Sequence, residues 1–148
     1  MFISDSKVLS GVVCLVVILL TSVQPSYAKG NLVARCEKLD TQELGIDDAG
    51  FAVLHPLYNI ETGKCYKLEI SSSGRHEYIL QGPEFFSSIY IRKLEVGKVE
   101  LGINSLRSID FDDEVSVELY FLVLKPGKYE ITDRVLGDKG TRFTFNVE

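Results

Sequence analysis

The chain has 148 residues, of which 25% are charged, and a formal net charge of −5 at pH 7. An acidic chain without clusters of Lys and Arg is a poor candidate for binding nucleic acid or an anionic membrane surface. The composition therefore argues against nucleic acid and anionic membranes as partners, and it does not by itself indicate a function.

The first 28 residues are ordered like a secretory signal peptide. The polar start Met1–Lys7 carries a single Lys, and the uncharged run Val8–Val23 follows it. After Gln24-Pro25, the residues Ser26-Tyr27-Ala28 supply a small-x-small cleavage site. The uncharged run is shorter than the ~20 residues of a membrane span, so cleavage near Ala28 is favoured over a membrane anchor. We expect an exported protein that does not contact the membrane after cleavage.

Removal of residues 1–28 from the 148 leaves 120 residues, the usual size of one domain. The removed part carries one Lys and one Asp, so the net charge stays at −5. We therefore expect a single domain over residues 29–148. Two cysteines remain in it, Cys36 and Cys65. An even count in an exported domain favours a disulfide, and a pair of buried free thiols is the alternative.

The N-terminal part of this domain, Asn31 to Ile60, has no regular pattern. Asn31–Lys38 and Phe51–Leu54 are candidate strands in it. Asp40–Gly45, and further along the chain Pro83–Ser88, are candidates for a single helical turn.

From Lys64 onward, apolar and polar residues alternate with a period of two, which predicts β-strands. The alternation is clearest in three runs: Lys64–Ile70, Val115–Leu124 and Arg142–Glu148. Shorter candidates are Glu77–Gln81, Ser88–Leu94, Lys98–Leu101 and Lys128–Thr132. Short strands with one apolar face each must bury those faces together, so we predict an all-β sandwich or barrel.

Turn residues separate these strands. Pro126-Gly127 is a tight turn, and Asp110–Glu114 is an acidic corner. The corner invites interpretation as a calcium loop, but it lacks the glycine and the ligand spacing of known loops. A solvated turn is the favoured interpretation.

Three segments resemble cupredoxin-like domains. Glu61–Ile70 is similar to their "a-G-k-x-y-x-l-x-i" strand, Pro126–Ile131 to their "P-G-x-Y-x-f" strand, and Gly74–Leu80 to the segment after the third strand. The resemblance covers Tyr58–Glu148. It is nearest to bacterial periplasmic cupredoxin-like proteins, which are distant relatives of plastocyanins and of the cupredoxin part of iron-uptake lipoproteins. It implies a periplasmic, Greek-key β-sandwich, in which the strands that carry the two cysteines share a sheet.

The copper ligands of the family can be compared with this sequence position by position. A type 1 copper centre needs two neutral imidazoles and a thiolate, with a weak axial ligand that is often Met. In the family the thiolate follows the "P-G-x-Y" strand, seven residues after the Pro, and that position here is Asp133. The stretch Arg134–Gly140 contains neither His nor Met, so His76 alone matches a family ligand. The resemblance therefore implies a cupredoxin-like protein without the type 1 copper site.

A different metal site is the alternative, built from His76, Glu77 and His55 or from the cysteines. One or two ligands without a third set no geometry, so a surface position for His76 and Glu77 is favoured. Pro83–Phe86 is the one loop with clustered aromatic residues, and core packing is favoured there over partner docking.

No catalytic motif is present in the sequence. We therefore predict a non-enzymatic binding or accessory module without a cofactor. Its partner is expected to be another periplasmic or envelope protein, met through the segments around His76, Pro83–Phe86 and Asp133–Gly140. The alternative function is copper binding or delivery through a non-blue site.

Overall fold

The computed structural model describes residues 35–148, so the expected signal peptide (residues 1–28) lies outside the described residues. Strands dominate this part of the chain. They are β1 (Glu37–Lys38), β2 (Gln42–Leu44), β3 (Leu57–Ile60), β4 (Cys65–Ser72), β5 (Tyr78–Gln81), β6 (Ile89–Val96), β7 (Val99–Leu101), β8 (Ser108–Phe111), β9 (Ser116–Val123), β10 (Gly127–Asp133) and β11 (Arg142–Val147). The helical elements are the short helix α2 (Pro83–Ser88) and the 3-10 turn η1 (Gly137–Lys139). No helix within residues 35–148 is long and apolar enough to cross a membrane.

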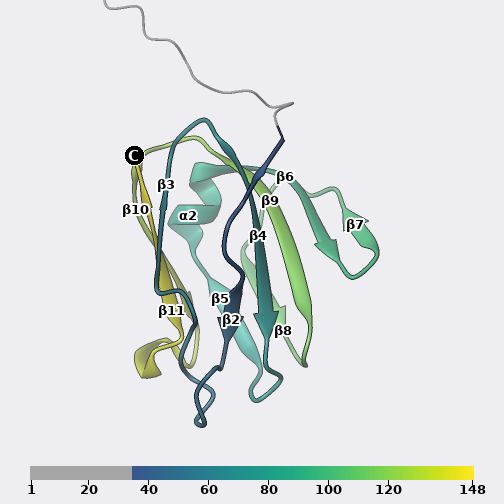
Figure 1. Cartoon of the computed structure of the whole chain (residues 1–148), viewed down its shortest axis with the longest axis vertical. Helices are drawn as coiled ribbons and strands as arrows, with labels where there is room; N and C mark the ends of the chain where they lie inside the picture. The colour runs from purple at the N-terminus through teal and green to yellow at the C-terminus, as the bar shows by residue number, and fades with distance from the viewer. Residues whose placement is uncertain (1–34) are drawn as a thin grey trace, which may run out of the picture.

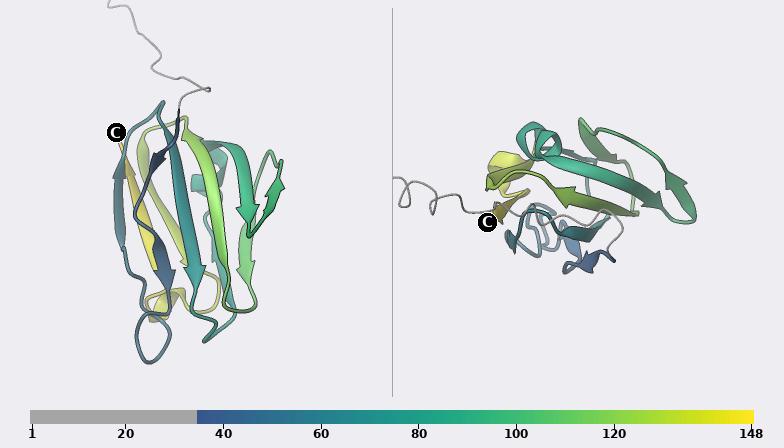
Figure 2. Two further views of the ribbon diagram at one scale, coloured as in Figure 1. Left: turned by 45° about the vertical axis from the view of Figure 1, so that its right-hand side comes forward. Right: turned by 90° about the horizontal axis from the view of Figure 1, so that it is seen from above.

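The strands form two sheets that pack face to face (Figures 1 and 2). Sheet A has the order β1-β4-β9-β6-β7, with β2 also beside β4, and sheet B has the order β3-β11-β10-β5-β8. The pairs of β1 and β2 with β4, and of β3 with β11, are parallel, and the other pairs are antiparallel. The fold is therefore a β-sandwich of two mixed sheets, which confirms the predicted all-β sandwich.

The sandwich forms because each long strand has one apolar face. In β9, Val117, Leu119 and Phe121 are buried, whereas Glu118 and Tyr120 between them lie on the outer face. In β4, Leu68 and Ile70 alternate with outward Lys67 and Glu69 in the same way. Because the period of a strand is two, this alternation fixes which side of sheet A meets sheet B.

Aromatic rings fill the space between the sheets. Phe85 of α2 is fully buried, and its ring stacks on that of Phe145 with 4.2 Å between the centroids. The ring of Phe121, from sheet A, makes T-shaped contacts with the rings of Phe85 and Phe145. The helix α2 thus contributes to the core.

Most strand predictions are confirmed, with ends shifted by a few residues. The confirmed strands are β4, β5, β6, β7, β9, β10 and β11, and the predicted helical turn at Pro83–Ser88 is α2. The candidate strand Asn31–Lys38 is confirmed only in its last two residues, as β1, and residues 31–34 lie outside the described part.

Other predictions for the irregular segments are wrong. Asp40–Gly45 contains the strand β2 instead of a helical turn, because its backbone pairs in parallel with β4. Phe51–Leu54 is not a strand, since Val53 forms only a single bridge to Leu44. The acidic corner Asp110–Glu114 is shorter than predicted, because Asp110 and Phe111 belong to β8.

Candidate functional site

The position of the family's copper thiolate is filled by a buried carboxylate. Asp133 ends β10 and is only 3% exposed. Its Oδ2 accepts the backbone N–H of Ile79 at 2.5 Å, and its Oδ1 accepts those of Val135 and Leu136 at 2.7 and 2.6 Å. Backbone donors can compensate a buried carboxylate in this way. Asp133 therefore ties the connection between β10 and β11 to β5.

His76 packs against a neighbouring loop at the same end of the sandwich. Its Nε2 lies 2.8 Å from the carbonyl oxygen of Ala49, and its ring stacks on Phe51 with 5.2 Å between the centroids. The ammonium of Lys139 lies 4.7 Å from the centroid of the same Phe51 ring. Glu77 is exposed and makes no contact with this cluster. His76 and Phe51 thus join the loops at this end to each other.

His55 has different neighbours. Its backbone N–H donates to Oε1 of Gln42 at 2.9 Å, and its carbonyl oxygen accepts from Nε2 of the same side chain. Its ring faces Tyr58, with 5.8 Å between the centroids. Among residues 35–148, no group of three or more His, Cys, Asp or Glu side chains is arranged to hold a metal ion. The candidates His55, His76 and Glu77 therefore do not meet in one site.

The aromatic segment Pro83–Phe86 belongs to the core. Phe85 and Phe86 are 0% and 5% exposed, which confirms the favoured core packing of these rings. Figure 1 also shows α2 beside the upper half of the sandwich, whereas the Asp133–Gly140 connection lies at the lower end. Of the three segments expected to form one contact surface, those of His76 and Lys139 both contact the Phe51 ring. Arg134 lines a separate hollow with Pro83 and Phe86.

Cys36 and Cys65 are joined by a disulfide in the structure, with 4.4 Å between their Cα atoms. The bridge links the residue before β1 to the first residue of β4, its neighbour in sheet A. Nη1 of Arg92 lies 3.2 and 3.3 Å from the two sulfur atoms.

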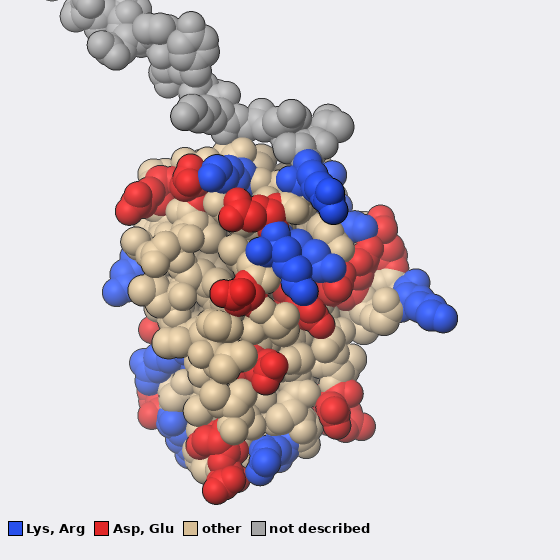
Figure 3. All heavy atoms as spheres, in the orientation of Figure 1, with Lys and Arg blue, Asp and Glu red and all other residues tan. Residues whose placement is uncertain are grey.

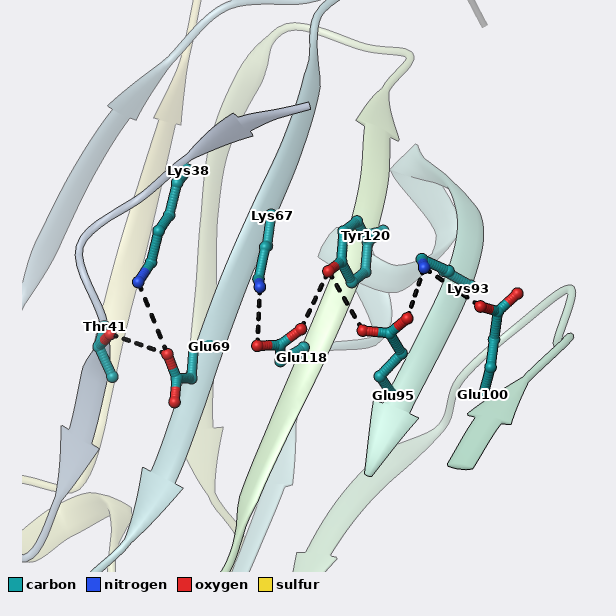
Figure 4. A network of polar contacts seen from close by, with 9 residues as sticks. All are labelled: Lys38, Thr41, Lys67, Glu69, Lys93, Glu95, Glu100, Glu118 and Tyr120. Carbon is teal, nitrogen blue, oxygen red and sulfur yellow. Dashed lines mark hydrogen bonds and ion pairs between the residues drawn. The ribbon is translucent and has the colours of Figure 1, made fainter. Parts of the chain in front are cut away.

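The outer face of sheet A carries two rows of polar side chains, all charged except Tyr120, and each row is in register across four strands. The lysine row consists of Lys38, Lys67, Tyr120 and Lys93, on β1, β4, β9 and β6. The glutamate row consists of Glu69, Glu118, Glu95 and Glu100, on β4, β9, β6 and β7. Figure 4 shows the three ammonium groups on one side of the glutamate row and the hydroxyl of Tyr120 between two carboxylates. In Figure 3 basic and acidic side chains lie next to one another over the upper part of the molecule.

Each row is held by contacts to the other. Lys67 lies 2.7 Å from Glu118, and Lys93 bridges Glu95 at 2.5 Å and Glu100 at 3.2 Å. The Tyr120 hydroxyl oxygen lies 2.9 Å from a carboxylate oxygen of Glu118 and 3.2 Å from one of Glu95, and its single O–H can donate to either. These contacts to Glu95 and Glu100 raise the pKa of Lys93 to about 12. The hydrogen bond from Lys93 lowers the pKa of Glu95, so Lys93 and Glu95 stay charged near neutral pH.

A hollow of about 810 Å³ lies beside the lysine row. Five of the residues that line it are cationic, and only one is acidic. Its lining consists of Arg35, Cys36, Lys38, Lys67, Arg92, Lys93, Glu100 and Tyr120. Sequence reasoning missed both rows and this hollow, since the only sequence signal is the pairing of charges two residues apart within single strands, such as Lys67 with Glu69 or Lys93 with Glu95.

Comparisons with known proteins bear on the fold. No family model matches the chain, and no curated protein matches its sequence. Among solved structures, it is similar to a multicopper oxidase from Campylobacter jejuni described as a metallo-oxidase, with a TM-score of 0.55 and 7% identity over 77% of this chain. McoA from the hyperthermophile Aquifex aeolicus gives a TM-score of 0.57 at 10% identity, and a multicopper oxidase from Pseudomonas Thermotolerans gives 0.57 at 13% identity, each over 83% of this chain.

The chain spans only 30%, 32% and 32% of the length of these three enzymes. At such low identity the likeness shows the fold alone. The chain has a cupredoxin-like fold, as its sequence resemblance predicted.

Proposed function

We propose that this chain is an exported, non-enzymatic binding module that meets another exported protein through the outer face of sheet A. The observation that carries the proposal is the register of the two charge rows. In the glutamate row, Glu69 faces Glu118, Glu118 faces Glu95, and Glu95 faces Glu100 on adjacent strands.

Like charges directly opposite each other destabilise a sheet by roughly 0.2–1 kcal/mol for each pair. Alternating the same Lys and Glu residues along each row would place opposite charges face to face and remove that cost. Here contacts between the rows, such as Lys67 with Glu118 and Lys93 with Glu95, offset that cost. The separation of the two charges into rows is therefore the feature that points to a partner, because complementary charge patterns select binding partners.

The rows suit a partner that carries the complementary pattern. Acidic side chains of the partner would enter the hollow beside the lysine row, and basic side chains would lie against the glutamate row. Side chains such as Lys67 and Glu118 are only 24% and 29% exposed, so their positions are set before a partner arrives. Complementary charges of this kind speed association and select the partner more than they add affinity.

The end of the sandwich near Asp133 is a weaker candidate for this contact. The carboxylate of Asp133 is satisfied by backbone N–H groups, and the ring of His76 is stacked on Phe51. These internal contacts also support a role without type 1 copper. The proposal includes a non-enzymatic role, because the sequence carries none of the known catalytic motifs.

Charge reversal tests the proposed contact surface. Photo-crosslinking from Tyr90, an exposed residue of β6, in the source cells should give a discrete product with one exported protein. The double variant Lys67→Glu/Lys93→Glu, and the milder Lys38→Glu, should remove this product, as should salt of about 0.5 M, which shortens electrostatic range to a few ångströms.

The control changes the charge equally elsewhere. Lys125→Glu/Lys128→Glu alters two exposed lysines at the turn between β9 and β10 and should keep the product. A product that survives the row variants would refute the proposed surface. One stoichiometric copper ion with the intense visible absorption of a type 1 centre, in the purified exported protein, would refute the copper-free part.

A further inference from the structure

A second hollow lies between α2 and the start of β8, and it has a different chemistry. Its volume is about 540 Å³. Arg107 and Arg134 line it, and no Asp or Glu does. Part of its wall belongs to the outer face of sheet B, where Gln81 and Ser108 pair across β5 and β8.

Both guanidinium groups are available to a ligand. Arg107 and Arg134 are exposed, and neither side chain has an ion pair or a side-chain hydrogen bond within residues 35–148. By contrast, Arg142 pairs with Asp138, and Arg75 donates to a backbone carbonyl oxygen. Two guanidiniums without carboxylates in one hollow form a local positive site on a chain whose net charge is −5.

The rest of the lining supplies polar groups and an apolar wall. The hydroxyl of Ser108 and the amide of Gln81 can donate hydrogen bonds. Pro83, Phe86 and Leu106 form the apolar part. A few convergent polar groups beside apolar side chains are typical of sites for small organic molecules.

The backbone around the hollow is fixed by the sheet. The N–H of Arg134 donates to the carbonyl oxygen of Ile79 at 2.9 Å, and the preceding residue, Asp133, anchors the same connection. Ser108 is held opposite Gln81 by the register of β5 and β8. The two arginines therefore extend from positions that are set before a ligand binds, which lowers the cost of binding.

We propose that this hollow binds a small organic anion, with its oxyanion head against Arg107 and Arg134 and its apolar body against the wall of Pro83, Phe86 and Leu106. Planar guanidinium groups match carboxylate and phosphate oxygens well, so either head fits. The site lies on the opposite sheet from the charge rows and stands independently of them.

The test is an amide NMR titration of the exported protein with four probes. Phenyl phosphate and benzoate carry both a head and a body, inorganic phosphate carries the head alone, and phenol carries the body alone. We expect phenyl phosphate or benzoate to shift the signals of Gln81, Ser108 and Arg134 and to bind more tightly than inorganic phosphate or phenol. The tighter of the two identifies the preferred head.

Variants then assign the contacts. The double variant Arg107→Gln/Arg134→Gln should weaken binding about tenfold, because charge-assisted hydrogen bonds are lost, and each single variant should weaken it less. Lys98→Gln, an exposed cation in the turn between β6 and β7, should leave binding unchanged. Unchanged affinity in the double variant, shifts centred on Lys67 and Lys93, or equal affinity for inorganic phosphate would each overturn the proposal.

Discussion

Replacement of the Asp133 carboxylate should cause a large fall in the free energy of unfolding. Asp133→Asn keeps the size of the side chain but exchanges one acceptor oxygen for an N–H₂ donor. That donor would face at least one of the N–H groups of Ile79, Val135 and Leu136, which now donate at 2.5–2.7 Å. A hydrogen bond to a charged group contributes about 1.5–3 kcal/mol, and an unsatisfied buried donor costs about 1–3 kcal/mol. We expect the free energy of unfolding to fall by about 3 kcal/mol.

Equilibrium unfolding in urea measures this change. With a slope of about 1.5 kcal/mol per molar urea, the midpoint should fall by about 2 M without a change in slope. Asp138→Asn is the matched control, because Asp138 lies in the same connection, is fully exposed, and forms a long ion pair with Arg142 at 3.8 Å. Its midpoint should equal that of the unmodified protein. An Asp133→Asn protein within about 0.5 kcal/mol of the unmodified one, the range of ordinary surface changes, would refute the anchoring role.

Three further outcomes follow from the packing and the electrostatics. Phe85→Ala should lower the free energy of unfolding by about 3–5 kcal/mol, measured in urea, because the ring is fully buried and stacked 4.2 Å from a phenylalanine ring of β11; a loss below about 1 kcal/mol would contradict this packing. Reduction of the bridge between Cys36 and Cys65, which are 29 residues apart, should cost about 3–4 kcal/mol through loop entropy, and an unchanged urea midpoint with reductant would argue against it. Lys93→Ala should raise the pKa of Glu95, followed by NMR titration of the carboxyl carbon. The hydrogen bond from Lys93 lowers the pKa of Glu95 in the folded protein. The stabilisation from this hydrogen bond is therefore present above the pKa of Glu95 in the unfolded chain and is lost as the pH falls through its pKa in the folded protein. A pKa of Glu95 that does not change in Lys93→Ala would contradict the contact.

The long strands were predictable because their sequence pattern and their burial have the same cause. In β9 and β11 every second side chain faces the core, so hydrophobic alternation reports the fold directly. The short strands β3 and β8 were not predicted. Each has four residues, of which only two are inward. In β8 the two outward residues are Ser108 and Asp110, and both favour turns when considered alone.

The error at β2 has a different origin. Gln42 is fully buried although it is polar, so it does not contribute to an apolar pattern. Its amide is satisfied by the backbone of His55, which it contacts as both donor and acceptor. That partner lies in a segment without regular structure, and no local rule places it opposite β2.

The candidate site shows the same division between local and long-range information. The sequence locates Asp133 at the family's thiolate position, since this depends on a nearby motif. The three N–H groups that its carboxylate accepts come from two separate segments and depend on how the chain folds. The charge rows depend entirely on register, because Lys38, Lys67, Tyr120 and Lys93 come from four strands far apart in sequence.

In a metalloprotein, the bound metal holds its ligand-bearing loops in position, because the free energy of metal binding contributes to the free energy of folding. In this chain hydrogen bonds and ring contacts hold the same end of the sandwich. Asp133 joins the last connection to β5, and Phe51 contacts both His76 and Lys139. These contacts would let the cupredoxin-like scaffold keep its shape without a copper ion, as the proposed function requires. The positions free to take on a binding role are then those on the outer faces of the two sheets, where the charge rows and the arginine-lined hollow lie.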